Sequence, residues 1–241
     1  MREPTQAAEA GTMVPALNDM TSTVASSAQD KLLRVEAARY ALLRRLAFSI
    51  RHQMVAHLQP IGMVTELLER RLRSPTPDLH QAHDSVARIN GLSKAAAQDC
   101  LDVITWMAPE PGATLPIGQA VEDCIMLLRG NFSFRGLSLR ADAGELPQAV
   151  GRAAVRTLLP ACLLALTDNL EGPAEITISA TANDETATVD FRVQRTEGEG
   201  YEKQLNYRAL QWEDVQAMAR SEDVELAHTD STARLGFPVL E

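Results

Sequence analysis

The chain has 241 residues, 45% of them hydrophobic and only 4% aromatic, so it can form one large domain or two modest domains, of which we expect two, each with its own core. Its net charge of −9 lies in residues 111–241, which hold 11 basic and 20 acidic side chains, and this excess argues against a nucleic-acid partner. Three scattered cysteines predict neither a disulfide framework nor a zinc site. Because the sequence shows no signal peptide and no apolar run of about 18 residues, we expect a cytoplasmic protein without a membrane partner.

The first 28 residues are small and polar and are interrupted by Pro4, Gly11 and Pro15. No helical or strand period is sustained through them. We therefore expect residues 1–28 to form a flexible leader.

Residues 29–108 have the pattern of two long helices. The first runs through 30–73 and the second through 79–107, joined by the short connector "SPTPD", whose Asp78 can cap the second helix. Helices joined by so short a loop pack antiparallel. Because one hairpin leaves an apolar stripe uncovered, we expect a homodimer in which two hairpins form a four-helix bundle.

A proline-rich linker at 108–116 leads into residues 116–241, where the pattern becomes mixed. We expect helices near 117–129, 148–167 and 208–220, and strands near 137–141, 174–182, 186–194, 224–229 and 233–240. The turn sequence "NDE" predicts that the two central strands form a hairpin. The predicted fold class is α+β, a helical hairpin followed by an α/β sandwich with one mostly antiparallel sheet.

Two histidines, His52 and His57, lie five positions apart in the first helix and therefore on different faces. An apolar seam follows one line of this helix: Leu43, Leu46, Met54, Ile61, Val64 and Leu68. His57 lies about 20° from the seam and is predicted to be a packed histidine with a partner in the bundle. His52 lies about 200° away, on the outer face with Phe48, Val55 and Gln59.

The surroundings of His52 have the features of a docking surface. Phe48 and Val55 flank it one turn to either side, so apolar groups accompany an exposed histidine. Arg44, Arg45 and Arg51 place positive charge near the same face, which favours a phosphorylated imidazole or an acidic partner. We expect Phe48, Arg45, Arg51, Val55 and Gln59 to contact a partner.

The stretch "RHQMVAHLQPIGMVTELLERR" resembles the phosphoacceptor helix of bacterial two-component histidine kinases, whose pattern is His-Glu-Leu-Arg-Thr-Pro-Leu followed by an apolar stretch ending in Glu-Leu-Leu. Alignment on Glu66-Leu67-Leu68 places the family's acceptor on His52. The segment "INGLSKAAAQDCLDVITW" is similar to the second bundle helix. "GQAVEDCIMLLRGNFSFRGLSLRAD" resembles the start of the ATP-binding domain, so the resemblance implies both units of the kinase core.

Several departures from the kinase pattern concern the chemistry at the histidine. Gln53 replaces the family's acid, and an amide cannot accept the imidazole proton during autophosphorylation. Ala56 replaces the residue that orients a hydrolytic water. His57 occupies the position of the family's proline, while Pro60 stands three residues later.

The nucleotide site departs further from the family. Ala161 and Ala165 stand where the family has two asparagines that help to hold magnesium and phosphate. Thr196 stands in place of the aspartate that reads adenine, although Gly198 and Gly200 keep the glycine spacing. The resemblance therefore implies that ATP binding and autokinase activity have been lost.

A kinase-like core without an ATP site resembles the dimeric histidine phosphotransferases of phosphorelays. The resemblance implies that His52 accepts and donates a phosphoryl group between response-regulator receiver domains, with a hybrid histidine kinase as a possible further partner. The chain would need no cofactor of its own, because the receiver supplies Mg²⁺. Two alternatives remain, a non-catalytic pseudokinase that binds a receiver or kinase and a divergent ATP-dependent kinase. A metal site at His80, His83 and Asp84 would need further ligands.

Overall fold

The computed structural model describes residues 16–107, 110–198 and 207–240, with the backbone alone described for 16–27, 102 and 105–107. Two long helices form the predicted hairpin, α1 (Ala16–Leu72) and α2 (Leu79–Met107). The Asp78 carboxylate accepts hydrogen bonds from the backbone N–H groups of His80 (3.0 Å) and Gln81 (3.1 Å), which confirms it as the cap of α2. None of the helices described is long and apolar enough to cross a membrane.

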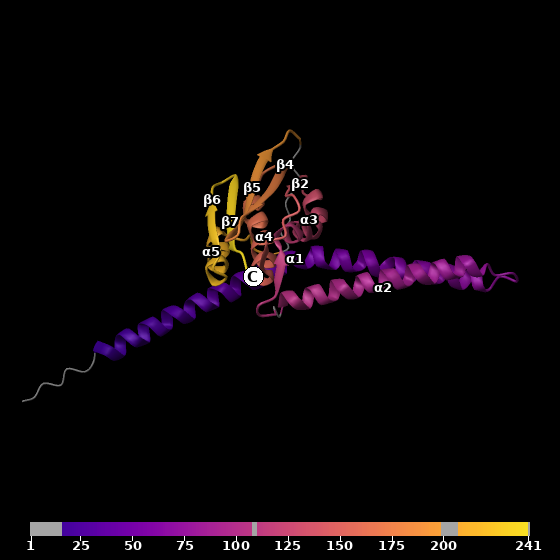
Figure 1. The fold of residues 1–241 in the computed structure, drawn as a ribbon, viewed down its shortest axis with the longest axis horizontal. Coiled ribbons are helices and arrows are strands. Elements are labelled where there is room, and N and C mark those ends of the chain that lie inside the picture. Colours follow the sequence, from indigo (N-terminus) through magenta and orange to yellow (C-terminus); the bar gives the residue numbers. More distant parts are fainter. Residues whose placement is uncertain (1–15, 108–109, 199–206, 241) are drawn as a thin grey trace, which may run out of the picture.

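The predicted leader is wrong from residue 16 onward, because α1 already begins at Ala16. No proline or glycine follows Pro15 before Pro60, and extending an existing helix fixes only one residue for each hydrogen bond gained. The rest of the predicted leader lies outside the described residues. Figure 1 shows the amino-terminal part of α1 extending away from the rest of the molecule.

The second unit is the predicted α+β layer, which confirms the fold class. Its helices are α3 (Ile117–Ser133), α4 (Arg152–Thr167) and α5 (Trp212–Ser221). Its strands are β1 (Thr114–Pro116), β2 (Leu137–Asp142), β3 (Ala149–Gly151), β4 (Ala174–Ala182), β5 (Thr186–Arg195), β6 (Glu225–His228) and β7 (Thr232–Pro238). The short strands β1 and β3 pair with each other and were not predicted; they lie in the expected linker and at the start of an expected helix.

The main sheet has the order β2-β4-β5-β7-β6, with only the β2–β4 pair parallel. The predicted hairpin at "NDE" is present, since β4 and β5 pair antiparallel along their whole length. Buried and less buried residues alternate along β4, β5 and β7, so one face of the sheet packs on a core. Figure 1 shows α3, α4 and α5 lying between this sheet and the helical hairpin.

The buried core of the α/β unit includes part of α1, which the sequence pattern did not indicate. Four residues on one face of α1 are at most 4% exposed and belong to the same buried cluster as the sheet and its helices: Ala38, Ala41, Leu42 and Leu46. Their spacing of three and four residues forms one helical stripe. The small side chains of Ala38 and Ala41 allow other helices to pack close to α1. Because this stripe is buried with the sheet and its helices, α1 belongs to the α/β unit as well as to the hairpin.

Candidate functional site

His52 lies exposed on α1, beside the helix α3 of the α/β unit. A side chain built onto Gly130 of α3 would place its Cβ 3.8 Å from His52 Cδ2, so the two helices meet at this histidine. The His52 ring stacks on Phe48, with centroids 6.3 Å apart and planes inclined by 4°. Among the residues that the structure describes, no hydrogen bond or ion pair engages either imidazole nitrogen of His52.

Four of the five predicted docking residues surround His52 on the surface. Phe48 and Val55 are 37% and 47% exposed, and Arg51 and Gln59 are exposed as well. The Arg51 guanidinium lies over the Phe48 ring, 5.7 Å from its centroid. The surface therefore combines an apolar ring, a cation and an accessible imidazole.

The placement of Arg45 on this surface was wrong. Its position seven residues before His52 puts it on the same side of α1, but it is only 6% exposed. Both of its terminal nitrogens donate to the carboxylate of Asp168, at the end of α4, with Nη2 2.7 Å from Oδ1. The α/β unit therefore buries the side of α1 that carries Arg45 but leaves His52, two turns later on the same side, exposed to solvent.

The Asp168 carboxylate is the centre of a buried polar network that the sequence pattern did not reveal. Besides Arg45, it accepts a hydrogen bond from the backbone N–H of Leu210 (3.2 Å), and Arg135 Nη1 lies 3.7 Å from Oδ1. Burial and the neighbouring Arg45 lower the pKa of the Arg135 guanidinium, and Asp168 only partly offsets them. This network connects α1, the end of α4 and the segment before α5.

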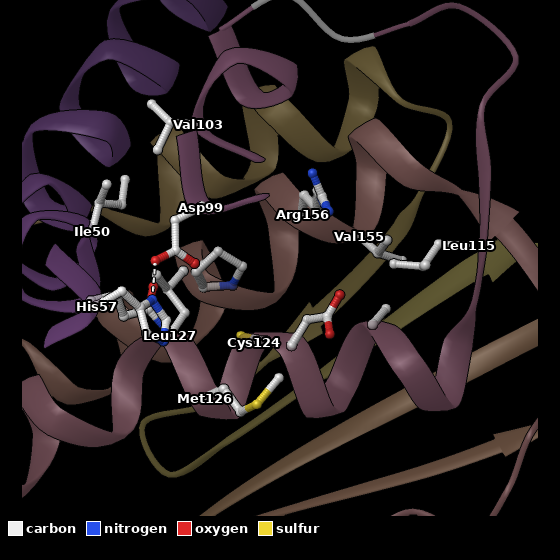
Figure 2. Close-up of a pocket in the computed structure, with 14 residues that line it drawn as sticks. Ile50, His57, Asp99, Val103, Leu115, Cys124, Met126, Leu127, Val155 and Arg156 are labelled. Atoms are coloured by element: carbon white, nitrogen blue, oxygen red, sulfur yellow. Dashed lines mark hydrogen bonds and ion pairs between the residues drawn. The ribbon is translucent and has the colours of Figure 1, made fainter. Parts of the chain in front are cut away.

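His57 has a defined partner within the hairpin, as predicted. Its Nδ1 lies 2.7 Å from the Asp99 Oδ2 of α2, and the two side chains are 36% and 23% exposed. Figure 2 shows this pair at one end of a cavity of about 260 Å³ between the hairpin and the α/β unit. His57 therefore faces the inside of the molecule, whereas His52 faces its surface.

The cavity is mainly apolar, and five polar side chains line it: Gln53, His57, Asp99, Asp123 and Arg156. Sequence reasoning missed Asp99, Asp123 and Arg156, because each is a single polar residue on a different helix and no local motif connects them. The Cys124 thiol also lines the cavity. Burial and the nearby Asp123 carboxylate raise its pKa well above the ordinary value, so it stays a neutral thiol.

The residues that the sequence resemblance aligns with a nucleotide site are alanines in the core and exposed loop positions. Ala161 and Ala165 are 0% and 4% exposed and pack inside the core. Thr196 and Gly198 are exposed, while Gly200 lies outside the described residues.

No cluster of three metal-ligating side chains occurs in the described part of the chain. His80, one of the residues considered for a metal, instead pairs with Asp84 in solvent, with Nδ1 3.2 Å from Oδ2.

Solved structures similar to this chain include the histidine kinase AdeS of Acinetobacter baumannii, at 14% identity and a TM-score of 0.38, covering 75% of this chain and 96% of that one. A bacterial phosphotransferase has 14% identity and a TM-score of 0.36, and the match covers 81% of this chain and 95% of that one. The blue-light activated histidine kinase EL346 of Erythrobacter litoralis has 13% identity and a TM-score of 0.41 and covers 76% and 63%. Neither a family model nor a curated protein matches. At these values the similarity is one of fold and identifies no reaction.

Proposed function

We propose that this protein is a histidine phosphotransferase of a bacterial phosphorelay, in which His52 carries a phosphoryl group from one receiver aspartate to another. The observation that carries this proposal is the contrast between the two histidines of α1. His52 is exposed and has no described partner at either ring nitrogen, while His57 is paired with Asp99. Of the two, His52 is the more exposed and is not already engaged by a carboxylate.

The reaction requires only an uncharged imidazole from this chain. A ring nitrogen of His52 attacks the phosphorus of a phosphoaspartate, the N–P bond forms, the P–O bond breaks, and the aspartate leaves as a carboxylate. The second transfer reverses these steps on another receiver. The partner supplies Mg²⁺ to neutralise charge on the phosphoryl oxygens. The guanidinium of Arg51, held over Phe48 next to His52, adds positive charge near the transferred group.

The local chemistry favours transfer between proteins over autophosphorylation. Gln53 follows His52 and cannot serve as the proton acceptor that the kinase reaction needs. Ala161 and Ala165 bring methyl groups into a closed core where a magnesium–nucleotide complex would need oxygen ligands. Phosphotransfer needs neither the acid nor the nucleotide.

The proposed receiver-docking surface is formed by α1 and α3 together. Phe48, Arg51, Val55 and Gln59 contribute from α1. On α3, Gly130 lies directly beside His52. Because glycine has no side chain, the imidazole stays accessible from that direction. A receiver that places its aspartate on His52 would therefore contact both units of the chain.

We also propose that the protein acts as a homodimer. Large apolar side chains between 42% and 65% exposed occur along both helices of the hairpin: Leu58, Met63, Leu67, Val86, Leu101 and Ile104. A second hairpin would cover them in a four-helix bundle. Sedimentation equilibrium should give twice the chain mass, and a monomer at micromolar concentration would contradict the dimer.

The function is tested by incubating the protein with a phosphorylated receiver domain and Mg²⁺. We expect acid-labile phosphate on the wild-type chain and on His57→Gln, and none on His52→Gln. Binding of the receiver without any phosphate on His52 would favour the pseudokinase. Nucleotide binding by calorimetry, together with autophosphorylation, would favour the divergent kinase.

A further inference from the structure

The cavity beside His57 lies where the two units of the molecule meet. Helices α1, α3 and α4 contribute most of its wall, and α2 and β1 supply the rest. Ile50 and Gln53 come from α1, Asp99 and Val103 from α2, and Asp123 from α3. A molecule bound there would touch both units at once. The cavity is separate from the His52 surface, because His52 does not line it.

The walls of the cavity are suited to an apolar body of small size. Its volume of about 260 Å³ is lined largely by aliphatic side chains: Ile50, Val103, Leu115, Leu127, Val155 and Pro160. A pocket with apolar walls and a few polar groups at fixed positions is the usual form of a small-molecule site. These polar groups determine which ligand is bound.

One of the two carboxylates that line the cavity has no cation paired with it among the described residues. Asp99 is paired with His57, and Arg156 has an interaction of its own. Asp123 accepts a hydrogen bond from the neutral side chain of Gln119 (2.8 Å), and no cation pairs with it among the described residues. A carboxylate that lines a mainly apolar cavity favours a ligand with a positive charge.

We propose that this cavity is a binding site for a small amphipathic amine, whose apolar part packs against Val103 and Leu127 and whose ammonium group pairs with Asp123. The bound amine connects α2 to α3 and stabilises the hairpin against the α/β unit. This site does not depend on the proposed phosphotransfer, since its residues take no part in that reaction.

The test uses 2-phenylethylamine, an aromatic ring on a short ammonium arm, and 3-phenylpropanoate, a similar body with a negative charge. Calorimetry on the full chain should give saturable binding of the amine, with a Kd of about 1 mM or lower, and none of the acid. The amine should also raise the melting temperature. Equal binding of both compounds, or no saturable binding of the amine, would overturn the proposal.

Two substitutions locate the binding. Asp123→Asn removes the charge at nearly constant volume and should weaken binding of the amine about tenfold, a loss typical of one charge-assisted contact. Glu122→Gln makes the same change on an adjacent exposed residue and should have no effect. Unchanged binding in Asp123→Asn would contradict the proposed ammonium contact.

Filling the cavity provides an independent variant. Val103→Trp should abolish binding of the amine, because the indole would occupy the same space. Leu79→Trp places the same side chain at the exposed start of α2, where the native leucine is 73% exposed, and should leave binding intact. Binding that survives Val103→Trp in a folded protein would place the amine elsewhere.

Discussion

His52 and His57 belong to the same helix and are separated by little more than one turn, yet the fold gives them different surroundings. His52 lies at the surface between α1 and α3 and stacks on Phe48. His57 pairs with Asp99 of α2 at a cavity between the hairpin and the α/β unit. The difference comes from what covers each side of α1, since the helix itself presents both residues equally well. A carboxylate partner and a cavity make a histidine structural, whereas an uncovered ring at a meeting of two helices remains available to another protein.

The largest expected effect concerns the ion pair that holds α1 in place. The side chains of Arg45 and Asp168 are 4% and 0% exposed, so Arg45→Met leaves a carboxylate with less compensation in the core. We expect a loss of about 3–5 kcal/mol in the free energy of unfolding, measured by urea denaturation. The double variant Arg45→Met with Asp168→Leu should recover a large part of this loss. A single variant as stable as wild type would contradict the role of this pair in holding α1 in place.

A larger side chain at position 130 of α3 should cover the His52 ring, which lies directly beside Gly130. Gly130→Leu should place a bulky side chain against the imidazole and slow phosphotransfer by about tenfold, equivalent to roughly 1.4 kcal/mol. Gly130→Ala adds a Cβ at an ordinary contact distance of 3.8 Å and should keep the rate. The alanine should also stabilise α3 by about 0.5–1 kcal/mol because glycine is a poor helix residue. Equal rates for the two variants would show that α3 does not border the reacting surface.

The pair at His57 should contribute to stability and not to transfer. Asp99→Asn removes the charge from a partly exposed pair, and we expect a loss of about 0.5–1 kcal/mol in the free energy of unfolding. Transfer to His52 should stay within about twofold of wild type, since a factor of two is only about 0.4 kcal/mol in the barrier. A strong fall in the transfer rate of a folded Asp99→Asn protein would mean that the two histidines are coupled.

The smallest effect is expected at the surface pair of Arg208 and Asp214, which serves as an exposed comparison for Arg45 and Asp168. Burial raises the pKa of Asp214, but hydrogen bonds from Arg208 and from the Gln211 backbone outweigh it, so the pKa is lowered. The pair therefore stabilises the protein above the unfolded pKa of about 4, and the contribution is lost as the pH falls through the folded pKa. Asp214→Asn should cost less than about 1 kcal/mol at pH 7. The stabilities of the two proteins should begin to approach each other below about pH 4 and become equal once the pH is below the folded pKa of Asp214.

The strands and helices of the α/β unit were largely predictable because their signals are local. The bounds of β4 agree with the predicted 174–182, and Asp78 caps α2 as its sequence suggested. Helical periodicity also placed His52 outside and His57 inside. Alternation, turn residues and caps act over a few positions and can be read without knowing the rest of the chain.

The burial of Arg45 could not be predicted in this way. Periodicity gives the direction in which a side chain leaves its own helix, but the element that covers that side is set by tertiary packing. Arg45 meets a carboxylate 123 positions later, and His57 meets one 42 positions later. The same limit hid the cavity, whose acidic residue Asp123 comes from a third helix.

The proposed function places the phosphoryl group on His52 and not on His57. The most direct measurement is to map phosphate in the wild-type chain after a brief reaction with a phosphorylated receiver, using peptides produced and analysed at alkaline pH. We expect phosphate on His52, its transfer to a second receiver, and normal transfer in His57→Gln. Phosphate on His57, or transfer that persists in His52→Gln, would contradict it.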